Sequence, residues 1–359
     1  MSRTAVVVGA GVFGLSVARE LSRRGWSVRV VDTNSPGTYG PSSAETRILR
    51  FCHGDDDWYP ALARLARTMW RALERESGRR FLLPSGVLVL SPPLPDDDGW
   101  VRASAHRLHR LGIPVETMAA TAVQRRFPGF DGRGSGTVLF EPHGAVLLAK
   151  EAVLALAESA RDRGAELIRA TAHVDGGTAV VNGERMPADV TVWAVGTALP
   201  ALFPGLTSVR AVRQDSWYLR PRGPWATAAD GRPAWLDRAH GFYGVPAVGA
   251  LGVKVVPDVE TPPRAPAGLP PDGLPDTIRA YLRARLPDLA DAPVSHREQC
   301  SYALTRDGDF LLARHPAHLG AWIVGGDSGH GFKHGPAWGA YVCDLIEGRT
   351  AAAARFALR

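Results

Sequence analysis

The sequence predicts a two-domain protein of the α/β plus α+β class, in which one domain is discontinuous and the second interrupts it. Three observations predict this fold. Residues 4–32 read as strand, glycine turn, helix and strand; residues 147–195 return to a helix followed by apolar strands; and residues 211–256 hold several short strand candidates. At 359 residues with 45% hydrophobic content, the chain is long enough for two cores.

The first unit is a strand at 5–8, a glycine turn, a helix to about residue 24 and a strand at 27–31. The turn reads Gly9-Ala10-Gly11-Val12-Phe13-Gly14, and its glycines let a pyrophosphate approach the N-terminus of the helix. Asp32 follows Gly14 by 18 residues, where its carboxylate could accept hydrogen bonds from ribose hydroxyls. The unit therefore predicts a Rossmann-like, dinucleotide-binding domain and leaves FAD and NAD both open.

The remaining elements are expected in the following order. A helix at 58–77 precedes a strand at 82–90 that alternates around Gly86, a surface loop at 91–98, a helix at 147–163, and strands at 166–171 and 190–195. Short strands, including 216–219 and 251–256, then lead to a proline-rich loop at 262–275 and a helix at 277–286. A strand at 322–324 enters a glycine-rich turn at 325–335, and a helix at 336–347 closes the order.

Composition excludes several classes of function. The net charge is +6 and the pI is about 9.5, but the arginines are spread along the chain among acidic residues, so nucleic acid is not expected. No membrane span is present, and the N-terminus suits a strand better than a secretion signal. The three cysteines show no metal-binding spacing, and the cytoplasm is the expected location.

Lysine is scarce in this chain. The 42 basic residues include only Lys150, Lys254 and Lys333, so 39 are arginine. Lysine is retained where a compact, titratable ammonium cannot be replaced by a planar guanidinium. Lys254 and Lys333 lie next to glycine-rich segments and are candidate functional residues, whereas Lys150 is read as a surface residue.

Segments along almost the whole chain resemble one family. They are the glycine turn, Thr46-Arg47-Ile48-Leu49-Arg50, Ser85-Gly86-Val87-Leu88-Val89, Gly241-Phe242-Tyr243-Gly244, Gly252-Val253-Lys254, Cys300 and Gly329-His330-Gly331-Phe332-Lys333. Together they resemble the sarcosine oxidase and N-methyl amino acid oxidase branch of the D-amino acid oxidase type flavoproteins. The resemblance implies FAD, an FAD-binding domain of residues 1–84, 141–210 and 300–359, and a mixed-sheet substrate domain of residues 85–140 and 211–299.

The resemblance also assigns the cofactor site. It implies a thioether to the flavin from Cys300, a single thiol that precedes a predicted strand, although a lone cysteine by itself is more often a buried structural thiol. The turn before the last helix is expected to face the flavin, with His330 contributing only backbone. The cofactor-binding residues implied are Gly9, Gly11, Val12, Phe13, Gly14, Asp32, Thr46, Arg47, Cys300, Gly329, His330, Gly331, Phe332 and Lys333.

Catalytic roles follow in the same way. Arg50 and Lys333 match a clamp for the substrate carboxylate, and Arg47 is expected near the flavin ring. Lys254 matches a lysine that promotes reaction with dioxygen, because a fixed cation stabilises the superoxide that forms. Tyr243 matches a pocket aromatic, and a core tyrosine is the alternative.

One departure concerns the substrate. Asp258 stands where sarcosine and N-methyl amino acid oxidases carry histidine; it is read as a catalytic residue at the amine pocket or as a loop aspartate turned to solvent. His53 also replaces another pocket residue. The expected function is therefore an FAD-dependent oxidase of a secondary or cyclic amino acid, reoxidised by dioxygen to give hydrogen peroxide.

Two alternatives remain open. One is an FAD-dependent D-amino or N-methyl amino acid dehydrogenase that uses another electron acceptor. The other is a non-catalytic dinucleotide-binding protein, which the glycine turn alone would support. The bias towards Arg, Ala, Gly and Pro suggests a bacterial source with a GC-rich genome.

Overall fold

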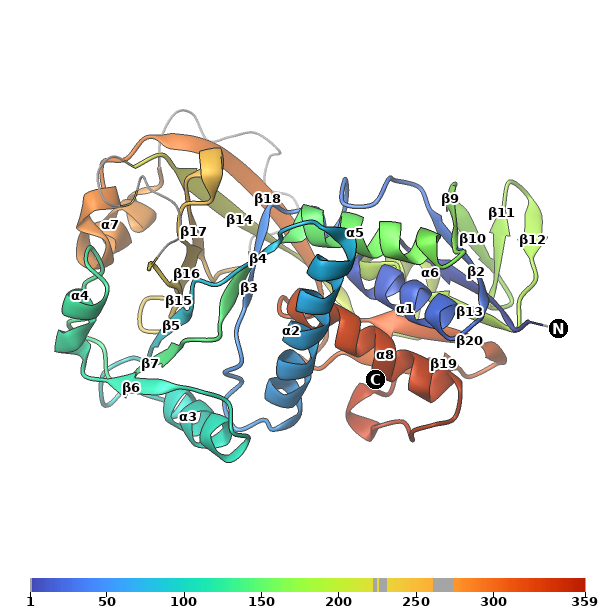
Figure 1. Ribbon diagram of the computed structural model, residues 1–359, viewed down its shortest axis with the longest axis horizontal. Coiled ribbons are helices and arrows are strands. Elements are labelled where there is room, and N and C mark those ends of the chain that lie inside the picture. The colour runs from blue at the N-terminus through green and yellow to red at the C-terminus, as the bar shows by residue number, and fades with distance from the viewer. Residues whose placement is uncertain (1, 222–224, 226–230, 261–273, 359) are drawn as a thin grey trace.

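The computed structural model describes residues 2–221, 225, 231–260 and 274–358. Its elements form two lobes, each built around its own large sheet, and the long strand β18 (Val294–Leu304) extends from one lobe towards the other (Figure 1). The proline-rich loop expected at 262–275 falls almost wholly outside the described residues.

A six-stranded sheet forms the core of the first lobe, in the order β19-β20-β13-β1-β2-β9. All neighbouring pairs are parallel except β19 and β20. The strands are β1 (Thr4–Val8), β2 (Ser27–Asp32), β9 (Glu166–Arg169), β13 (Val190–Trp193), β19 (Leu311–His315) and β20 (His318–Gly325). Because β13 and β20 come from much later in the chain than β1, the sheet confirms the predicted discontinuous α/β domain.

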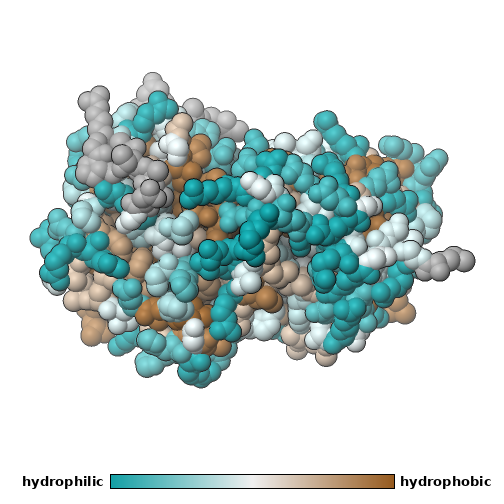
Figure 2. All heavy atoms as spheres, viewed as in Figure 1, coloured by the Kyte–Doolittle hydropathy of each residue, from teal (hydrophilic) through white to brown (hydrophobic). Residues whose placement is uncertain are grey.

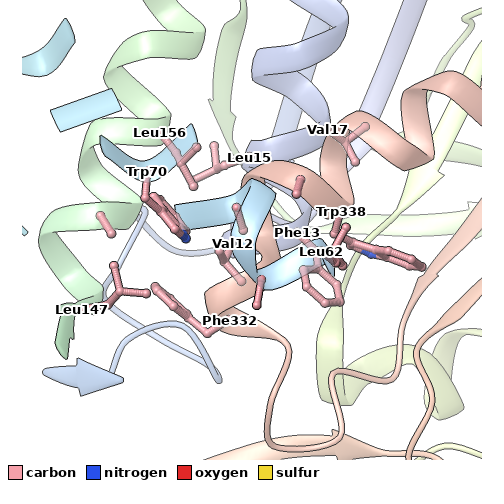
Figure 3. Close-up of a cluster of buried hydrophobic side chains, with 14 of the residues drawn as sticks. Val12, Phe13, Leu15, Val17, Leu62, Trp70, Leu147, Leu156, Phe332 and Trp338 are labelled. Carbon is pink, nitrogen blue, oxygen red and sulfur yellow. The ribbon is translucent and has the colours of Figure 1, made fainter. Parts of the chain in front are cut away.

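Helices pack against one another beside this sheet. They are α1 (Val12–Arg23), α2 (Trp58–Ser77), α5 (Ala149–Asp162) and α8 (Gly335–Ile346), with the one-turn α6 (Leu199–Leu202) near β13. Val12 and Leu15 of α1 meet Trp70 of α2 and Leu156 of α5 in one buried cluster, which also contains Trp338 of α8 (Figure 3). This packing fixes the glycine turn that precedes α1.

An eight-stranded sheet forms the second lobe, in the order β18-β14-β17-β16-β15-β5-β7-β6. Only β15 and β5 pair in parallel, so the sheet is mixed, as predicted. Besides β18, the strands are β5 (Val87–Leu90), β6 (Glu116–Met118), β7 (Val138–Glu141), β14 (Arg210–Leu219), β15 (Ala234–Asp237), β16 (Phe242–Val245) and β17 (Val253–Pro257). The α-helices α3 (Trp100–Arg110), α4 (Val123–Arg126) and α7 (Asp276–Arg285) belong to the described part of this lobe.

Smaller elements complete the fold. One three-stranded sheet joins β3 (Thr46–Leu49), β8 (Ala145–Leu148) and β4 (Leu82–Leu83), and another joins β10 (Ala172–Asp175), β11 (Thr178–Val181) and β12 (Glu184–Met186). Short 3-10 helices occur at Ala120–Ala122, Gly196–Ala198, Gly249–Leu251, Pro287–Leu289, Phe332–His334 and Ala354–Phe356.

Three local expectations need correction. The strand expected at 82–90 is two strands in different sheets, because Gly86 turns with a φ of +69° and a Cβ there would lie 2.4 Å from the Phe140 ring. The helix expected from 147 begins at Ala149, since the preceding leucines pair with β3. Cys300, expected before a strand, lies within β18.

The surface in Figure 2 is largely hydrophilic, and its hydrophobic residues form small, separate groups. Within the described residues, every helix is too short or too polar to cross a membrane.

Candidate active site

A cavity of about 500 Å³ is lined by residues of both lobes. At one end are the glycine turn and Asp32 of the six-stranded sheet. At the other are Tyr243, Lys254 and Cys300, which lie on three strands of the eight-stranded sheet. The fold thus brings the predicted dinucleotide site and four of the six predicted catalytic residues to a single cavity.

The glycine turn is packed too closely for other residues. A Cβ at Gly9, whose φ is +107°, would lie 2.3 Å from the Ala194 carbonyl oxygen, and a Cβ at Gly14 would lie 1.9 Å from that of Gly9. Gly9, Gly11, Val12 and Phe13 line the cavity, whereas Gly14 acts only in packing the turn. The turn therefore exposes backbone to the cavity at the start of α1.

Asp32 also lines the cavity, at the end of β2. One carboxylate oxygen accepts a hydrogen bond from the Ala10 amide at 2.7 Å, and the other accepts from the Asn34 amide at 2.8 Å. Each oxygen retains acceptor capacity for a further partner. Asp32 therefore holds the glycine turn in place and remains available to a ligand's hydroxyls.

Thr46 and Arg47 enter the cavity wall from β3. Arg47 donates to the carbonyls of Thr46 and Pro41, and its guanidinium carbon lies 5.8 Å from the centre of the Phe332 ring. Burial lowers the pKa of Arg47, but the acidic groups of Cys300 and Glu298 outweigh it and keep the pKa above its ordinary value. Arg47 is consequently a fixed cation at the cavity.

Lys254 supplies a second buried cation, from β17. Its side chain is only 4% exposed, its Nζ lies 3.5 Å from Oε2 of Glu298, and it faces the Tyr218 ring at 5.4 Å. Burial lowers the pKa of Lys254 below the usual value, and Glu298 partly opposes that shift. Glu298 is itself held by the hydroxyl of Tyr218 at 2.9 Å and the amide of Glu45 at 3.2 Å.

Cys300 lies opposite Gln214 in the antiparallel pairing of β18 with β14, and both line the cavity. The Tyr243 hydroxyl donates to Oε1 of Gln214 at 2.6 Å, and Nε2 of Gln214 donates to Asp258 at 3.1 Å. Asp258 does not line the cavity, so it meets the site only through Gln214. Burial raises the pKa of the Tyr243 hydroxyl, which keeps this residue a neutral donor.

The turn before α8 forms the next wall. Gly329, His330, Phe332 and Lys333 line the cavity, whereas Gly331 packs against Asp327 and Phe13. Lys333 Nζ donates to the His330 carbonyl at 2.9 Å, and Trp70 Nε1 donates to the Lys333 carbonyl at 2.8 Å. Burial, with the nearby Arg50 cation second, holds the pKa of Lys333 well below its usual range.

Asp327 begins this turn and also lines the cavity. Burial raises the pKa of its carboxyl group to about 6. Its Oδ1 accepts from the Ala303 amide at 2.9 Å, and its carbonyl accepts from the His330 and Gly331 amides. Asp327 therefore ties the turn to β18, the strand that carries Cys300.

Arg50 lies behind the cavity wall and does not line the cavity. Its guanidinium donates to the Cys52 carbonyl and lies 5.8 Å from the Trp100 ring. The buried Glu141 accepts hydrogen bonds from the Phe51 and Cys52 amides, both at 2.7 Å, and so fixes the segment that follows Arg50. Arg50 and Lys333 interact electrostatically, but only Lys333 reaches the cavity in this structure.

Sequence reasoning missed four residues of the site: Glu141, Gln214, Glu298 and Asp327. Each acts by holding another side chain or a segment of backbone, and none belongs to a motif used above. Asp327, which lies in the glycine-rich turn before Gly329, was the only one with a local signal.

Comparison with known proteins identifies the family and the fold. Residues 4–345 match the FAD dependent oxidoreductase family. The chain belongs to this family. As an FAD-dependent oxidoreductase it uses FAD, and the glycine turn, Asp32 and the cavity suit such a dinucleotide. The predicted family is thereby confirmed.

Relatives match over nearly the full chain. The chain is 26% identical to monomeric sarcosine oxidase of Bacillus sp. (strain B-0618), with 96% of this chain and 92% of that protein covered. It is also 26% identical to N-methyl-L-tryptophan oxidase of Salmonella heidelberg (strain SL476), with coverages of 96% and 95%. The crystal structure of L-proline dehydrogenase from P. horikoshii superposes with a TM-score of 0.83 at 20% identity, covering 98% of this chain and 94% of that one, which confirms the fold.

Proposed function

We propose that this FAD-dependent oxidoreductase is an oxidase of a secondary or cyclic amino acid, with dioxygen as the final electron acceptor. One observation carries the proposal: a single cavity joins the dinucleotide-binding turn to Arg47 and to two buried lysines, Lys254 and Lys333. Such cations attract an anionic substrate and stabilise the anion that forms when dioxygen is reduced. The sarcosine and N-methyl-L-tryptophan oxidases supply the substrate class.

The residues that would hold FAD are spread along the cavity. The amides at the start of α1 would meet the pyrophosphate, and Asp32 the ribose. Thr46, Arg47 and the turn from Gly329 to Lys333 would surround the ring, with Cys300 attached to it by a thioether. When bound, FAD supplies the two-electron acceptor for a hydride from the carbon beside the substrate nitrogen.

Lys333 and Arg50 would bind the substrate carboxylate. Lys333 offers an ammonium in the cavity wall, and Arg50 stands close enough behind it to lower its pKa. A bound carboxylate would offset the repulsion between these two cations. Because it would also attract the Arg50 guanidinium, Arg50 would turn towards the cavity. The carboxylate would thus orient the carbon that loses hydride.

Tyr243 and Asp258 would shape the amine side of the pocket. Hydrogen bonds link both residues to Gln214. They fix the direction of the Tyr243 hydroxyl and hold the Asp258 carboxylate directly behind Gln214, which lines the cavity. A carboxylate there would favour a substrate whose amine is protonated. Because the resemblance implies histidine at this position in the sarcosine and N-methyl amino acid oxidases, we place a larger or cyclic imino acid ahead of sarcosine.

Lys254 would promote the reaction with dioxygen. Electron transfer to dioxygen produces a negative charge, and a cation that is held in place by Glu298 and shielded from water stabilises that charge strongly. This role distinguishes an oxidase from a dehydrogenase that uses another acceptor.

A screen for hydrogen peroxide release tests the proposal. N-methyl, cyclic, D- and L-amino acids would be compared with matched amines that lack the carboxylate; we expect carboxylated secondary or cyclic amines to react fastest and the matched amines to react only slowly. Turnover without peroxide under air would indicate a dehydrogenase, and no turnover of any carboxylated amine would contradict the substrate assignment. Colour that stays with the acid-precipitated chain, and is lost in Cys300→Ser, would support the thioether.

Two further proposals concern the cellular compartment and the domain boundaries. Cys52, Cys300 and Cys343 are free thiols, which supports a reducing compartment such as the cytoplasm. We retain 1–84, 141–210 and 300–359 as the FAD-binding domain and 85–140 and 211–299 as the substrate domain, while β18 runs across the boundary at 300.

A further inference from the structure

Three histidines come together below the cavity wall. His53 follows β3, His330 lies in the turn after β20, and His334 ends the 3-10 helix Phe332–His334. One ring nitrogen from each can be chosen so that all three nitrogens lie within 4.8 Å of one another. Only His330 lines the cavity, and His334 is fully buried.

Backbone carbonyls set the tautomers of two of these rings. His53 Nδ1 lies 2.9 Å from the Phe51 carbonyl oxygen, and His330 Nε2 lies 3.0 Å from that of Gly308. A carbonyl oxygen can only accept, so these two nitrogens carry the hydrogens. The lone pairs therefore belong to His53 Nε2 and His330 Nδ1.

Those lone pairs have no hydrogen-bond partner within the part of the chain that the structure describes. His53 Nε2, His330 Nδ1 and both ring nitrogens of His334 are buried without a partner. Buried polar atoms are usually satisfied, so several unsatisfied ring nitrogens within one cluster of histidines indicate a missing ligand. A carbonyl-bound imidazole with a free second nitrogen is also the usual arrangement of a metal ligand.

Aromatic rings enclose the cluster. Tyr59 stacks on His53 with ring centres 5.3 Å apart and meets the edge of His330 at 4.8 Å. Phe310 stacks on His330 at 5.0 Å and lies 5.6 Å from His334. The Tyr59 hydroxyl donates to Asp309, so the ring is held in place as a wall. The enclosure limits access of water and keeps the three imidazoles close together.

We propose that His53, His330 and His334 form a binding site for a transition-metal ion of the zinc or copper kind. Three neutral imidazoles suit these ions, whereas magnesium and calcium require oxygen ligands. Nitrogens around tetrahedral zinc lie about 2.0–2.1 Å from the ion, so the rings must move inward by roughly 1 Å. The nearby Arg50 and Lys333 oppose a cation, which limits the affinity and favours an anion as the fourth ligand.

The metal would cross-link two segments that are far apart in sequence. The segment 50–57 carries Arg50 and His53, and the turn 326–334 carries Lys333 with the other two histidines. One ion would therefore fix the position of Arg50 relative to Lys333, the two residues of the proposed carboxylate clamp. The metal site itself does not depend on the substrate assignment.

Zinc binding by the flavin-loaded, untagged chain tests the site. After treatment with a chelator, calorimetric titration with zinc chloride should give one ion per chain. His334→Leu and His53→Phe should each weaken this binding by about 100-fold or more. His318→Leu is the matched control, since His318 and His315 form a half-buried pair at the ends of β20 and β19.

Two further measurements guard against misfolding. Flavin absorbance and melting temperature report whether each variant retains the fold, and X-ray absorption of the zinc-loaded unaltered chain should show three imidazole nitrogens at about 2.0 Å. No uptake by the unaltered chain would mean that water fills the cluster and would overturn the proposal. Unchanged uptake in either cluster variant, or a different ligand set, would do the same.

Discussion

Lys254 Nζ lies 3.5 Å from Oε2 of Glu298, within a wall of the cavity from which water is largely excluded. The lysine comes from β17 and the glutamate from β18, and the two strands flank β14 in the sheet. The glutamate fixes the position of the ammonium and opposes the loss of its proton. Lys254 and Glu298 therefore act as a unit.

Replacing Lys254 tests the proposed reaction with dioxygen. In Lys254→Met we expect reoxidation of the reduced enzyme by dioxygen to slow by about 100-fold or more, because a positioned cation no longer stabilises the oxygen anion. Anaerobic reduction by substrate should change much less. Stopped-flow absorbance separates the two half-reactions, and Lys150→Met on the exposed side of α5 is the control. An unchanged rate with dioxygen would refute the assignment.

The same reaction should depend on pH. Burial places the pKa of Lys254 below the ordinary value for lysine, and the cation exists only below that pKa. The rate with dioxygen should therefore fall as the pH rises through the alkaline range. Glu298→Gln removes a carboxylate that raises the pKa of Lys254. In this variant the rate with dioxygen should therefore begin to fall at a lower pH. If the pH profile of Glu298→Gln matched that of the unaltered enzyme, or was shifted to higher pH, the proposed coupling of Lys254 to Glu298 would be wrong.

Arg50→Lys tests the carboxylate clamp. The variant keeps the charge but loses the planar fork, so kcat/KM for a carboxylated substrate should fall by about 10- to 100-fold. The loss should vanish for an amine without the carboxylate. Arg133→Lys, in an exposed ion pair with Asp131, is the control and should not affect kinetics. Equal losses on both substrates would indicate a general structural effect instead.

Glu141→Ala tests the support behind Arg50. The change leaves the Phe51 and Cys52 amides buried without their acceptor, so the free energy of unfolding should fall by about 2–4 kcal/mol. Because Arg50 then loses its fixed backbone, KM should also rise. Urea unfolding and steady-state kinetics measure the two effects, with the exposed Glu184→Ala as reference. A stability change no larger than in Glu184→Ala would show that Glu141 has no such role.

Long, strongly patterned elements were predictable from sequence. The helix at 58–77 was predicted with the bounds observed for α2, since a 20-residue apolar pattern ends at Gly78, which takes a φ of +68°. The short strands β10, β11 and β12 were missed because each has four residues or fewer. Their structure comes from pairing with one another, which leaves little signal in any one segment.

The residues of the site also include some that were predictable from sequence and some that were not. Cavity residues such as Gly9, Lys254 and Cys300 belonged to motifs or stood out by rarity, so they could be singled out. Glu141 and Glu298 are two among 36 acidic residues, and their roles depend on partners between 44 and 253 positions away. Only the folded chain reveals such partners.

The strand order of the six-stranded sheet also has a consequence for biosynthesis. β1 pairs with β13, β13 pairs with β20, and α1 packs on α8, so β1 and α1 are made long before β20 and α8 can join them. Contacts this distant in sequence form slowly. A nascent chain that still lacks β20 and α8 consequently has no complete cofactor pocket, and we expect FAD to be taken up only after α8 has been made.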